Sequence, residues 1–271
     1  MSAASSLQGT LKFISVLGLF VGFIGEGLFR NIWALLFNIP RFELQRSRAD
    51  SISRYSRWTL KVLGITTNSN LGRPAPSGLW VGNHLSYVDV LVLASNFPCS
   101  FVTSVEVRDT PVLGWITRLA GCIHVERRSR EQLAEETREM RVMLQAGIPI
   151  ILFPEGTSSP GITVLPFRPA LFQAAIDAGV DTHAFYLKHS QSEIAYFGDH
   201  QFFKHLWRVC QMGSSLSTIH LVETVPFPWI DRKSLAARCH LAVSSFHASF
   251  AQEPGNPSYR MEQHRNCSNP G

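Results

Sequence analysis

The sequence predicts an α/β fold: a mixed, largely parallel sheet flanked by helices, with an N-terminal membrane-associated helical segment. Two observations predict it. From residue 79 onward, short apolar runs alternate with longer segments that carry helix caps, as expected for strands and helices that follow one another in turn. Before that point, an uninterrupted apolar run at 13–25 is followed by a second apolar stretch at 31–40 and then by a basic segment.

Composition narrows the class of protein. The 271 residues are enough for one catalytic domain with additions, and the hydrophobic share of 45% with 17% charged residues excludes a disordered chain and a polytopic membrane protein. The net charge of +5 suits contact with anionic lipid, nucleic acid or an anionic thioester donor. The five cysteines form no CxxC pair and the ten histidines no HExxH motif, so buried free thiols and no metal site are expected.

The N-terminal segment, residues 1–67, is expected to anchor the protein at a membrane. The run at 13–25 is short for a span, which needs about 20 residues, and Glu26 and Arg30 interrupt it. Two arrangements remain open: one span, or a helical hairpin that lies in one leaflet. The basic residues that follow, with interleaved aromatic residues, are typical of a segment on anionic headgroups, although a solvated helix face is the alternative. They are Arg41, Arg46, Arg48, Arg54, Arg57 and Lys61, with Tyr55 and Trp58.

A loop at 68–78, rich in Gly, Pro, Ser and Asn, is interpreted as the start of a catalytic domain that extends over 68–250. The remaining residues, 251–271, are expected to form a flexible C-terminal tail. Strands are predicted at 79–82, 99–105, 122–127, 148–153, 182–189 and 217–225. Helices are predicted at 86–97, 110–121, 129–146, 169–179 and 232–250, the third with Ser129 as its N-cap and closed by Gly147.

The first segment with a candidate catalytic role is GNHLSYVD, residues 82–89. If His84 lies in the turn before the helix and Asp89 on its first turn, the two side chains can converge. A neutral imidazole can then take a proton from an alcohol, while the carboxylate fixes its tautomer and stabilises the imidazolium. The competing interpretation is structural, because Ser86 and Asp89 also match a helix capping box.

Two further segments place polar residues at strand ends. In LFPEGTSS, a very apolar strand runs into Glu155 and Gly156, where a glycine turn can direct backbone N–H groups toward an anion. In GCIHVERR, Arg127 or Arg128 leaves a strand end and can hold a phosphate. Each segment alone also fits a solvated turn.

Together, NHLSYVD, GCIHVER and FPEGT resemble the glycerolipid acyltransferase family, which includes the 1-acylglycerol-3-phosphate acyltransferases. The family's H-x4-D motif falls on His84 and Asp89, its second motif on Gly121 to Arg127, and its F-P-E-G-T motif on Phe153 to Thr157. The resemblance covers about residues 75–225.

The resemblance implies direct acyl transfer from acyl-CoA or acyl carrier protein to the hydroxyl of a lysolipid, in phospholipid biosynthesis. His84 would be the base and Asp89 its orienting partner; no cofactor or metal is implied. The catalytic domain is expected on the cytoplasmic face of the membrane. The residues expected to bind substrate are Arg127, Phe153, Pro154, Glu155, Gly156, Thr157 and Arg168. A separate hypothesis is that the Gly156 amide and its neighbours stabilise the oxyanion.

Departures from the family pattern bear on the acceptor. Members that act on lysophosphatidic acid often carry Lys and Arg where this chain has Ser104 and Ser158. Loss of two cations weakens binding of a phosphomonoester dianion. A lyso-phosphodiester or a lyso-ornithine lipid is therefore an alternative acceptor. A catalytically inactive membrane-surface module is the non-enzyme alternative, and no nucleic-acid partner is expected, because the clustered charge lies beside the apolar run.

Overall fold

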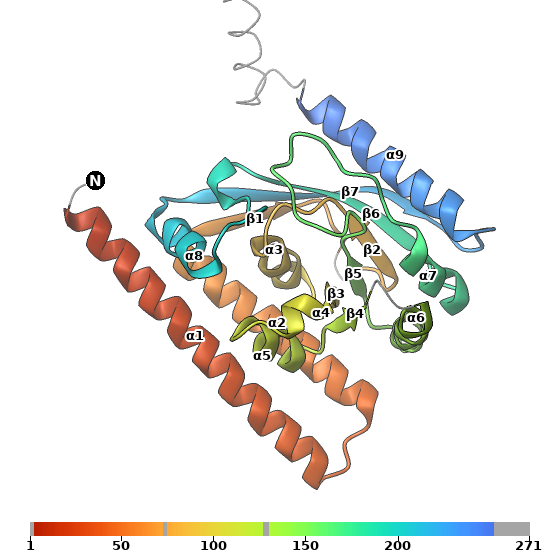
Figure 1. The fold of residues 1–271 in the computed structure, drawn as a ribbon, viewed down its shortest axis with the longest axis horizontal. Helices are drawn as coiled ribbons and strands as arrows, with labels where there is room; N and C mark the ends of the chain where they lie inside the picture. The colour runs from red at the N-terminus through yellow and green to blue at the C-terminus, as the bar shows by residue number, and fades with distance from the viewer. Residues whose placement is uncertain (1–2, 73–74, 127–129, 252–271) are drawn as a thin grey trace, which may run out of the picture.

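The described residues, 3–72, 75–126 and 130–251 of a computed structural model, form a seven-stranded sheet with helices on both faces (Figure 1). The strand order is β1-β7-β6-β2-β5-β3-β4. Every neighbouring pair is parallel except β6 and β7, which are antiparallel. The predicted mixed, largely parallel sheet is confirmed. The strands are β1 (Ile65–Ser69), β2 (Leu79–Gly82), β3 (Ser100–Ser104), β4 (Ile123–Val125), β5 (Ile150–Leu152), β6 (Thr182–His189) and β7 (Ser215–Val225).

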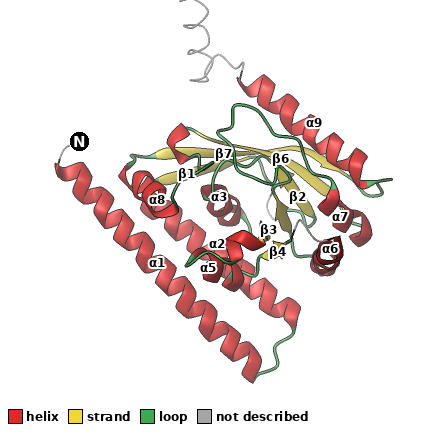
Figure 2. Cartoon of the chain, in the orientation of Figure 1, coloured by secondary structure: helices red, strands yellow, loops and turns green. Residues whose placement is uncertain are grey.

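Two apolar cores hold the helices against the sheet. Successive residues of a strand point to opposite faces, so Trp80 enters one core and its neighbours Leu79 and Val81 enter the other. The first core includes α1, α2, α3, α5 and α8; the second includes α6, α7 and α9 (Figure 2). The helices are α1 (Ala3–Leu36), α2 (Arg41–Leu63), α3 (Val88–Asn96), α4 (Val105–Arg108), α5 (Leu113–Leu119), α6 (Arg130–Gln145), α7 (Gln173–Ala178), α8 (Phe202–Gln211) and α9 (Arg232–Ala251), with short 3-10 turns η1 (Ala170–Phe172) and η2 (Ser192–Ile194).

Some elements differ from the sequence prediction. The helix expected at 110–121 is shorter in the structure: α5 covers only Leu113–Leu119, because Val112 just before it adopts a left-handed φ of 67°. The four-residue helix α4, which precedes the expected helix, was not predicted. Strand β1 was not predicted, and it pairs with β7. The expected domain start at residue 68 falls inside this strand, so the sheet begins at Ile65. The expected tail beyond residue 251 lies outside the described residues, as does the predicted N-cap Ser129.

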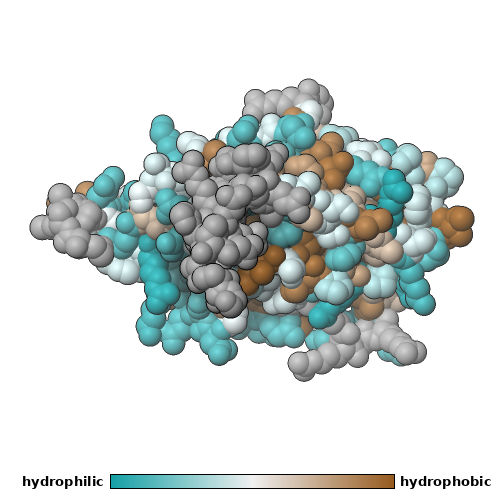
Figure 3. All heavy atoms as spheres, turned by 90° about the horizontal axis from the view of Figure 1, so that it is seen from above, coloured by the Kyte–Doolittle hydropathy of each residue, from teal (hydrophilic) through white to brown (hydrophobic). Residues whose placement is uncertain are grey.

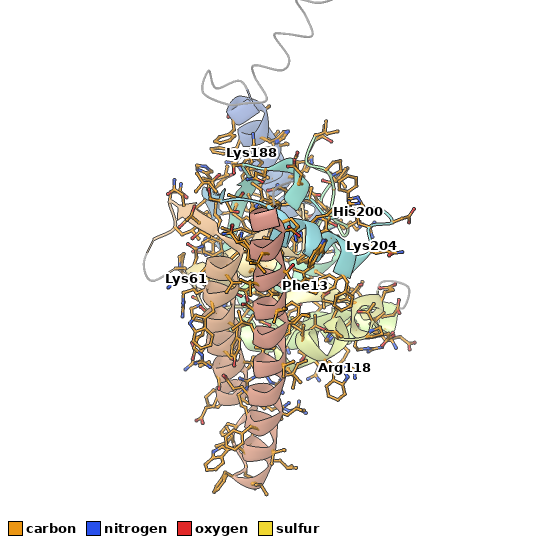
Figure 4. The ribbon with its side chains drawn as sticks, turned by 90° about the vertical axis from the view of Figure 1, so that its left-hand side faces the viewer. Phe13, Lys61, Arg118, Lys188, His200 and Lys204 are labelled. Carbon is orange, nitrogen blue, oxygen red and sulfur yellow. The ribbon has the colours of Figure 1, made fainter. Side chains whose placement is uncertain are left out.

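Helices α1 and α2 form an antiparallel hairpin whose closed end projects beyond the sheet (Figures 1 and 4). α1 is one continuous helix rather than two apolar stretches, and its residues Ser6–Leu36 are long and apolar enough to cross a membrane. Its first half packs on the domain: Lys12 Nζ donates to the carbonyls of Leu63 and Met212, and Phe13 meets Trp207 of α8 edge to face. In the second half, Nη2 of Arg30 donates to the Leu119 carbonyl at the end of α5 at 2.9 Å, so only the closed end beyond Arg30 extends away from the domain.

The hairpin carries most of the exposed apolar surface. Of the 22 large apolar residues that are exposed in the described chain, 13 lie between Leu7 and Trp58. By contrast, the face over α9 in Figure 3 mixes hydrophilic and apolar residues. Inside the hairpin, Glu26 bonds to Arg54 at 2.6 Å and to the Ser51 hydroxyl at 2.8 Å. These bonds explain why a charged residue interrupts the apolar run: it joins α1 to α2.

Candidate functional site

The candidate site lies where three adjacent strands of the sheet end. The order β6-β2-β5 places His189, the last residue of β6, beside the segments that leave β2 and β5. His84 follows β2, and Glu155 follows β5. In α/β sheets, ligands bind outside the carboxyl ends of parallel strands. The fold therefore brings together motifs that are about 70 and 35 residues apart in the sequence at one such edge.

Asn83 fixes the segment that carries His84. Its side-chain amide donates to the Leu187 carbonyl and accepts from the Leu187 amide, both at 2.8 Å. A side chain thereby continues the hydrogen bonding between β2 and β6 after β2 itself has ended. Gly82 just before it allows a close approach, because an added Cβ would lie 2.5 Å from the Phe185 carbonyl oxygen.

The structure brings His84 and Asp89 together. Nδ1 of His84 donates to Oδ2 of Asp89 at 2.9 Å, with His84 in the turn before α3 as expected. The same oxygen accepts from the amides of Leu85 at 2.6 Å and Ser86 at 3.0 Å, while the Val88 amide lies 3.3 Å from the Ser86 hydroxyl. Asp89 therefore both caps the helix start and orients the imidazole, so the contacts that each interpretation requires are present together.

Asp89 is completely buried between two histidines. Its second oxygen, Oδ1, accepts from Nε2 of His189 at 2.7 Å, and Nδ1 of His189 lies 2.8 Å from the Ser217 hydroxyl on β7. Burial by itself raises the pKa of Asp89, but the hydrogen bonds and charges of His189 and His84 outweigh it and hold the pKa well below its usual range. Asp89 is thus a carboxylate at neutral pH.

The far side of His84 remains accessible. Its side chain is 20% exposed, whereas Asp89 is fully buried. The imidazole stacks on Phe153, with ring centroids 4.0 Å apart and planes 13° apart, and Phe153 in turn meets Phe185 edge to face. With Nδ1–H pointing at the carboxylate, Nε2 is the free acceptor position. The arrangement can therefore accept a proton from an alcohol that approaches Nε2.

Glu155 is a buried carboxyl group beside this dyad. The residue is 3% exposed, Oε1 accepts from the Leu165 amide at 3.3 Å, and Oε2 has no partner among the described residues. Burial is the largest cause that raises the pKa of Glu155, to about 8; the Asp89 charge adds to it, and backbone hydrogen bonds from Leu165 and His84 oppose it. Buried, incompletely satisfied carboxyls with raised pKa values are typical of functional sites.

The glycine turn after Glu155 is not arranged as the oxyanion hypothesis requires. Gly156 has a φ of 77°, as a turn glycine, but its amide donates to the Phe153 carbonyl at 3.1 Å. That N–H is engaged within the turn, so the hypothesis is wrong for the Gly156 amide. Thr157, the next motif residue, is exposed. Pro154 is buried, and its carbonyl accepts from the Arg168 amide at 2.9 Å.

Of the two arginines expected to bind substrate, Arg168 lies within the described residues and Arg127 does not. Arg168 is exposed, and the bond from its amide to Pro154 keeps its backbone beside the F-P-E-G-T segment. Arg127 lies outside the described residues. Ser104 ends β3 at the same edge of the sheet. Ser158, which stands where an arginine is expected for an enzyme that acts on lysophosphatidic acid, donates its hydroxyl to the Tyr196 carbonyl.

The connection from β6 to α8, residues 190–201, joins the two motif loops. The Tyr196 amide donates to the Leu85 carbonyl at 2.8 Å, and the Tyr196 carbonyl accepts from Ser158. The Tyr87 hydroxyl bonds to Nδ1 of His205 at 3.0 Å, and Nε2 of His205 donates to the carbonyls of Glu193 and Ala195. The connection thereby holds the loops that follow His84 and Glu155 at a fixed separation.

Sequence reasoning missed Asn83, His189 and Ser217. All three are buried polar residues at the ends of apolar strands, and 182–189 was predicted only as a strand. The available signal was that β6 ends in a histidine after a run that is otherwise mostly apolar. A single histidine at a strand end is usually explained by packing, so only the fold reveals its contact with Asp89.

Comparisons with known proteins find similar chains. A family model described as Acyltransferase matches residues 65–188. A lyso-ornithine lipid O-acyltransferase of Rhodobacter capsulatus is 32% identical over 202 residues, which are 70% of this chain and 72% of the relative. A 1-acyl-sn-glycerol-3-phosphate acyltransferase of Neisseria meningitidis serogroup B is 36% identical over 147 residues, 53% of this chain. The aligned part spans only 57% of that relative's length.

The fold has a solved counterpart. The crystal structure of PlsC, a 1-acyl-sn-glycerophosphate (LPA) acyltransferase from Thermotoga maritima, matches with a TM-score of 0.67 at 19% identity. The match covers 93% of this chain and 99% of the other. Fold and site define an α/β protein with a histidine–aspartate dyad at the edge of a largely parallel sheet. Given the extent and identity of these matches, the chain belongs to the acyltransferase family.

Proposed function

We propose that the protein is a lysolipid O-acyltransferase that moves a fatty acyl group from acyl-CoA or acyl carrier protein to the free hydroxyl of a lysoglycerolipid. The observation that carries the proposal is the His84–Asp89 pair, joined at 2.9 Å with the other side of the imidazole accessible. A general base of this kind has a use only where a weakly acidic proton, such as that of an alcohol, must be removed.

The proposed transfer is direct. Nε2 of His84 takes the proton of the acceptor hydroxyl as its oxygen attacks the thioester carbonyl carbon. The new C–O bond forms, the C–S bond breaks, and His84 returns the proton to the departing thiolate. Asp89 stabilises the imidazolium that exists between these two proton transfers. The transfer as proposed uses no metal or bound cofactor.

The acceptor is proposed to lie along the F-P-E-G-T segment. Phe153 forms an apolar wall beside His84, and Pro154 fixes the segment through the Arg168 amide. Glu155 offers the unpartnered Oε2 for an acceptor hydroxyl. Gly156 shapes the turn, and Thr157 and Arg168 are exposed and available for a headgroup. Arg127 is proposed as a second cation for the headgroup from its place in the motif. Charged headgroups favour arginine because its guanidinium can bind two oxygens at once.

Two acceptor classes remain in competition: 1-acyl-sn-glycerol 3-phosphate and a lyso-ornithine lipid. A specific observation favours the second. Ser104 and Ser158 stand where cations are expected for a phosphomonoester, and the Ser158 hydroxyl is already bonded to Tyr196. A relative named lyso-ornithine lipid O-acyltransferase, from Pseudomonas aeruginosa, aligns over 82% of this chain at 27% identity.

The α1–α2 hairpin is proposed to sit in one leaflet, with the catalytic domain on the cytoplasmic face. α1 is packed on the domain as far as Arg30, whose Nη2 donates to the Leu119 carbonyl at 2.9 Å, so only the closed end beyond Arg30 is available to enter lipid. From Asn31 to Leu36 the helix extends about 8 Å, which fits within the apolar depth of one leaflet, about 15 Å. Phe29, Trp33 and Phe37 form an exposed aromatic row at this end.

The test of the function is a matrix of two donors and two acceptors with the purified protein, assayed by thiol release and by the lipid product. Acyl-CoA and acyl carrier protein are each offered with 1-acyl-sn-glycerol 3-phosphate and with a lyso-ornithine lipid. We expect acceptor-dependent thiol release with at least one pair. Thiol release without an acylated lipid, or no release with any pair, would contradict the proposal.

The membrane placement is tested by sedimentation with anionic vesicles. Replacement of Phe29, Trp33 and Phe37 by serine is expected to move the protein from the pellet to the supernatant, because burial of apolar area drives interfacial binding. Leu241→Ser on α9, which removes an exposed leucine from a different face, is the control and is expected to leave sedimentation unchanged. Equal sedimentation of both variants would contradict the hairpin as the anchor.

A further inference from the structure

Asp89 has an unusual position for the orienting carboxylate of a dyad, because a histidine contacts each of its oxygens. His84 approaches Oδ2 from the loop after β2, and His189 approaches Oδ1 from the end of β6. The second contact, at 2.7 Å, is the shorter of the two. It joins residues that are 100 positions apart, so the fold and not the local helix start creates it.

The two oxygens are unequally supplied with donors. Oδ2 accepts from His84 and from the amides of Leu85 and Ser86. Among the described residues, Oδ1 has the single hydrogen bond from His189. A fully buried carboxylate oxygen without a donor is strongly unfavourable. Removal of the His189 bond would therefore favour protonation or rotation of the carboxyl group.

Ser217 fixes the state in which His189 can make this bond. His189 and Ser217 are register partners on antiparallel β6 and β7, and the Ser217 hydroxyl is 2.8 Å from Nδ1. When the hydroxyl donates to Nδ1, the neutral ring carries its proton on Nε2, which faces Asp89. Both ring nitrogens are then engaged. With a side chain that is only 3% exposed, His189 has no access to substrate.

We propose that His189, oriented by Ser217, is a positioning residue that acts on the reaction through Asp89: it occupies Oδ1 and keeps the carboxylate ionised and turned toward His84. The expected effect of His189 on turnover rests on the proposed acyl transfer. The titratable groups that face Asp89 are His84, His189 and Glu155, which come from the ends of β2, β6 and β5.

The positioning role of His189 predicts how the pH dependence of kcat/KM changes when His189 is replaced. Loss of the donor to Oδ1 makes the dyad easier to protonate, so the acidic limb of kcat/KM should move to higher pH, by about one unit for one hydrogen bond to a charged group. A role limited to folding would lower the amount of active protein equally at every pH and would leave that limb in place.

The strand offers a matched control. His183, near the start of β6, pairs with Thr224 of β7 as His189 pairs with Ser217: Nδ1 lies 3.0 Å from the Thr224 hydroxyl. Its Nε2 donates to the Ser77 carbonyl, not to a carboxylate. His183→Leu therefore removes a buried histidine and its cross-strand bond without touching the dyad.

The experiment compares full-length wild type, His189→Leu, His189→Gln and His183→Leu, with the donor and acceptor that the wild type uses best. For His189→Leu we expect kcat to fall about 10- to 100-fold, as for loss of an orienting partner of a functional histidine, with KM nearly unchanged and the acidic limb shifted upward. His189→Gln keeps an N–H donor near Oδ1 and should restore most of both. Unchanged kinetics, or a pH-independent loss equal to that of His183→Leu, would overturn the proposal.

Two further measurements keep the proposal decidable. If circular dichroism shows that His189→Leu does not fold, Ser217→Ala replaces it, with a smaller shift of the same sign expected and an unmoved limb as the contrary result. If the wild type transfers no acyl group, the proposed function fails, but the Asp89 carboxyl can still be titrated by carbon-13 NMR. A higher Asp89 pKa in the leucine variant supports the positioning role, and an unchanged pKa refutes it.

Discussion

The two ends of β6 carry the same local arrangement with different outcomes. At each end, Nδ1 of a buried histidine accepts a hydrogen bond from a hydroxyl group of β7, and Nε2 of the same histidine donates to an oxygen. Near the start of the strand that oxygen is the Ser77 carbonyl, and His183 lies against Trp80 in a closed, satisfied cluster. At the end it is the Asp89 carboxylate, next to the partly exposed His84.

The function of a buried histidine in this strand thus depends on the group that its Nε2 contacts. The Ser77 carbonyl is fixed in a loop, so its bond to His183 connects to no reactive group in the described part of the chain. A carboxylate that holds a second, accessible imidazole connects the buried residue to solvent and to substrate. The comparison also separates effects on stability, expected near His183, from effects on turnover, expected near His189.

The largest effect that would sharpen this contrast is expected from Asp89→Asn. The amide has one N–H₂ group, and either orientation sets it against existing donors or leaves His84 in the wrong tautomer. We expect kcat to fall by about 10³- to 10⁴-fold, as for loss of the carboxylate in a histidine–aspartate pair. Steady-state thiol release checks it. A loss of less than tenfold would mean that the carboxylate is only a helix cap.

An intermediate effect, on the melting temperature, is expected from replacement of Glu155. Among the described residues, its Oε2 is unpartnered at the catalytic edge of the sheet, whereas both ring nitrogens of His183 are paired at the opposite edge. The folded-state pKa of Glu155 is about 8, against an ordinary 4.5. Because it is raised, its contribution to stability is fully present below about pH 4.5 and is lost as the pH rises through about 8.

Glu155→Gln removes that loss, so its melting temperature should exceed that of the wild type by an amount that grows from pH 5 to pH 9, on the order of several degrees. Differential scanning calorimetry across this range provides the measurement. A difference between variant and wild type that stays constant with pH would show that Glu155 is ionised in the folded protein.

The smallest effect on turnover is expected from His183→Leu. The substitution leaves the Thr224 hydroxyl and the Ser77 carbonyl without partners in the interior, at a cost of about 1–3 kcal/mol in the free energy of unfolding. In the described structure the hydrogen bonds of His183 go to Thr224 and Ser77 and not to the dyad, so kcat should stay within about twofold of the wild type. Urea denaturation measures the free energy of unfolding, and thiol release measures kcat. A large fall in kcat for the folded variant would contradict the distinction between His183 and His189.

Much of the fold could be predicted because strands β2 and β5 and most of β6 are apolar and follow turn residues. β1 could not, since its sequence ITTNS is exposed at three of five positions and pairs only with a strand 150 residues away. The late start of α5 depends on one left-handed residue, Val112, which helical periodicity does not indicate. Local patterns describe what one segment buries, not the partner that it meets.

The site divides in the same way. His84, Asp89 and Glu155 could be named from sequence because each belongs to a short motif whose spacing carries its own geometry. His189 and Ser217 could not, because their contact with Asp89 depends on β6 lying beside β2 and on the register of β6 against β7. The Gly156 amide was misassigned, since a positive φ indicates a turn but not which acceptor its N–H finds.

The most direct test of the account is thiol release by purified His84→Ala, with the donor and acceptor that the wild type uses best. The substitution removes the only part of the dyad that a substrate can reach in the described structure, and it leaves the helix cap at Asp89 in place. We predict a folded protein whose acyl transfer does not exceed the uncatalysed background. Turnover close to that of the wild type would contradict the assignment of His84 as the general base.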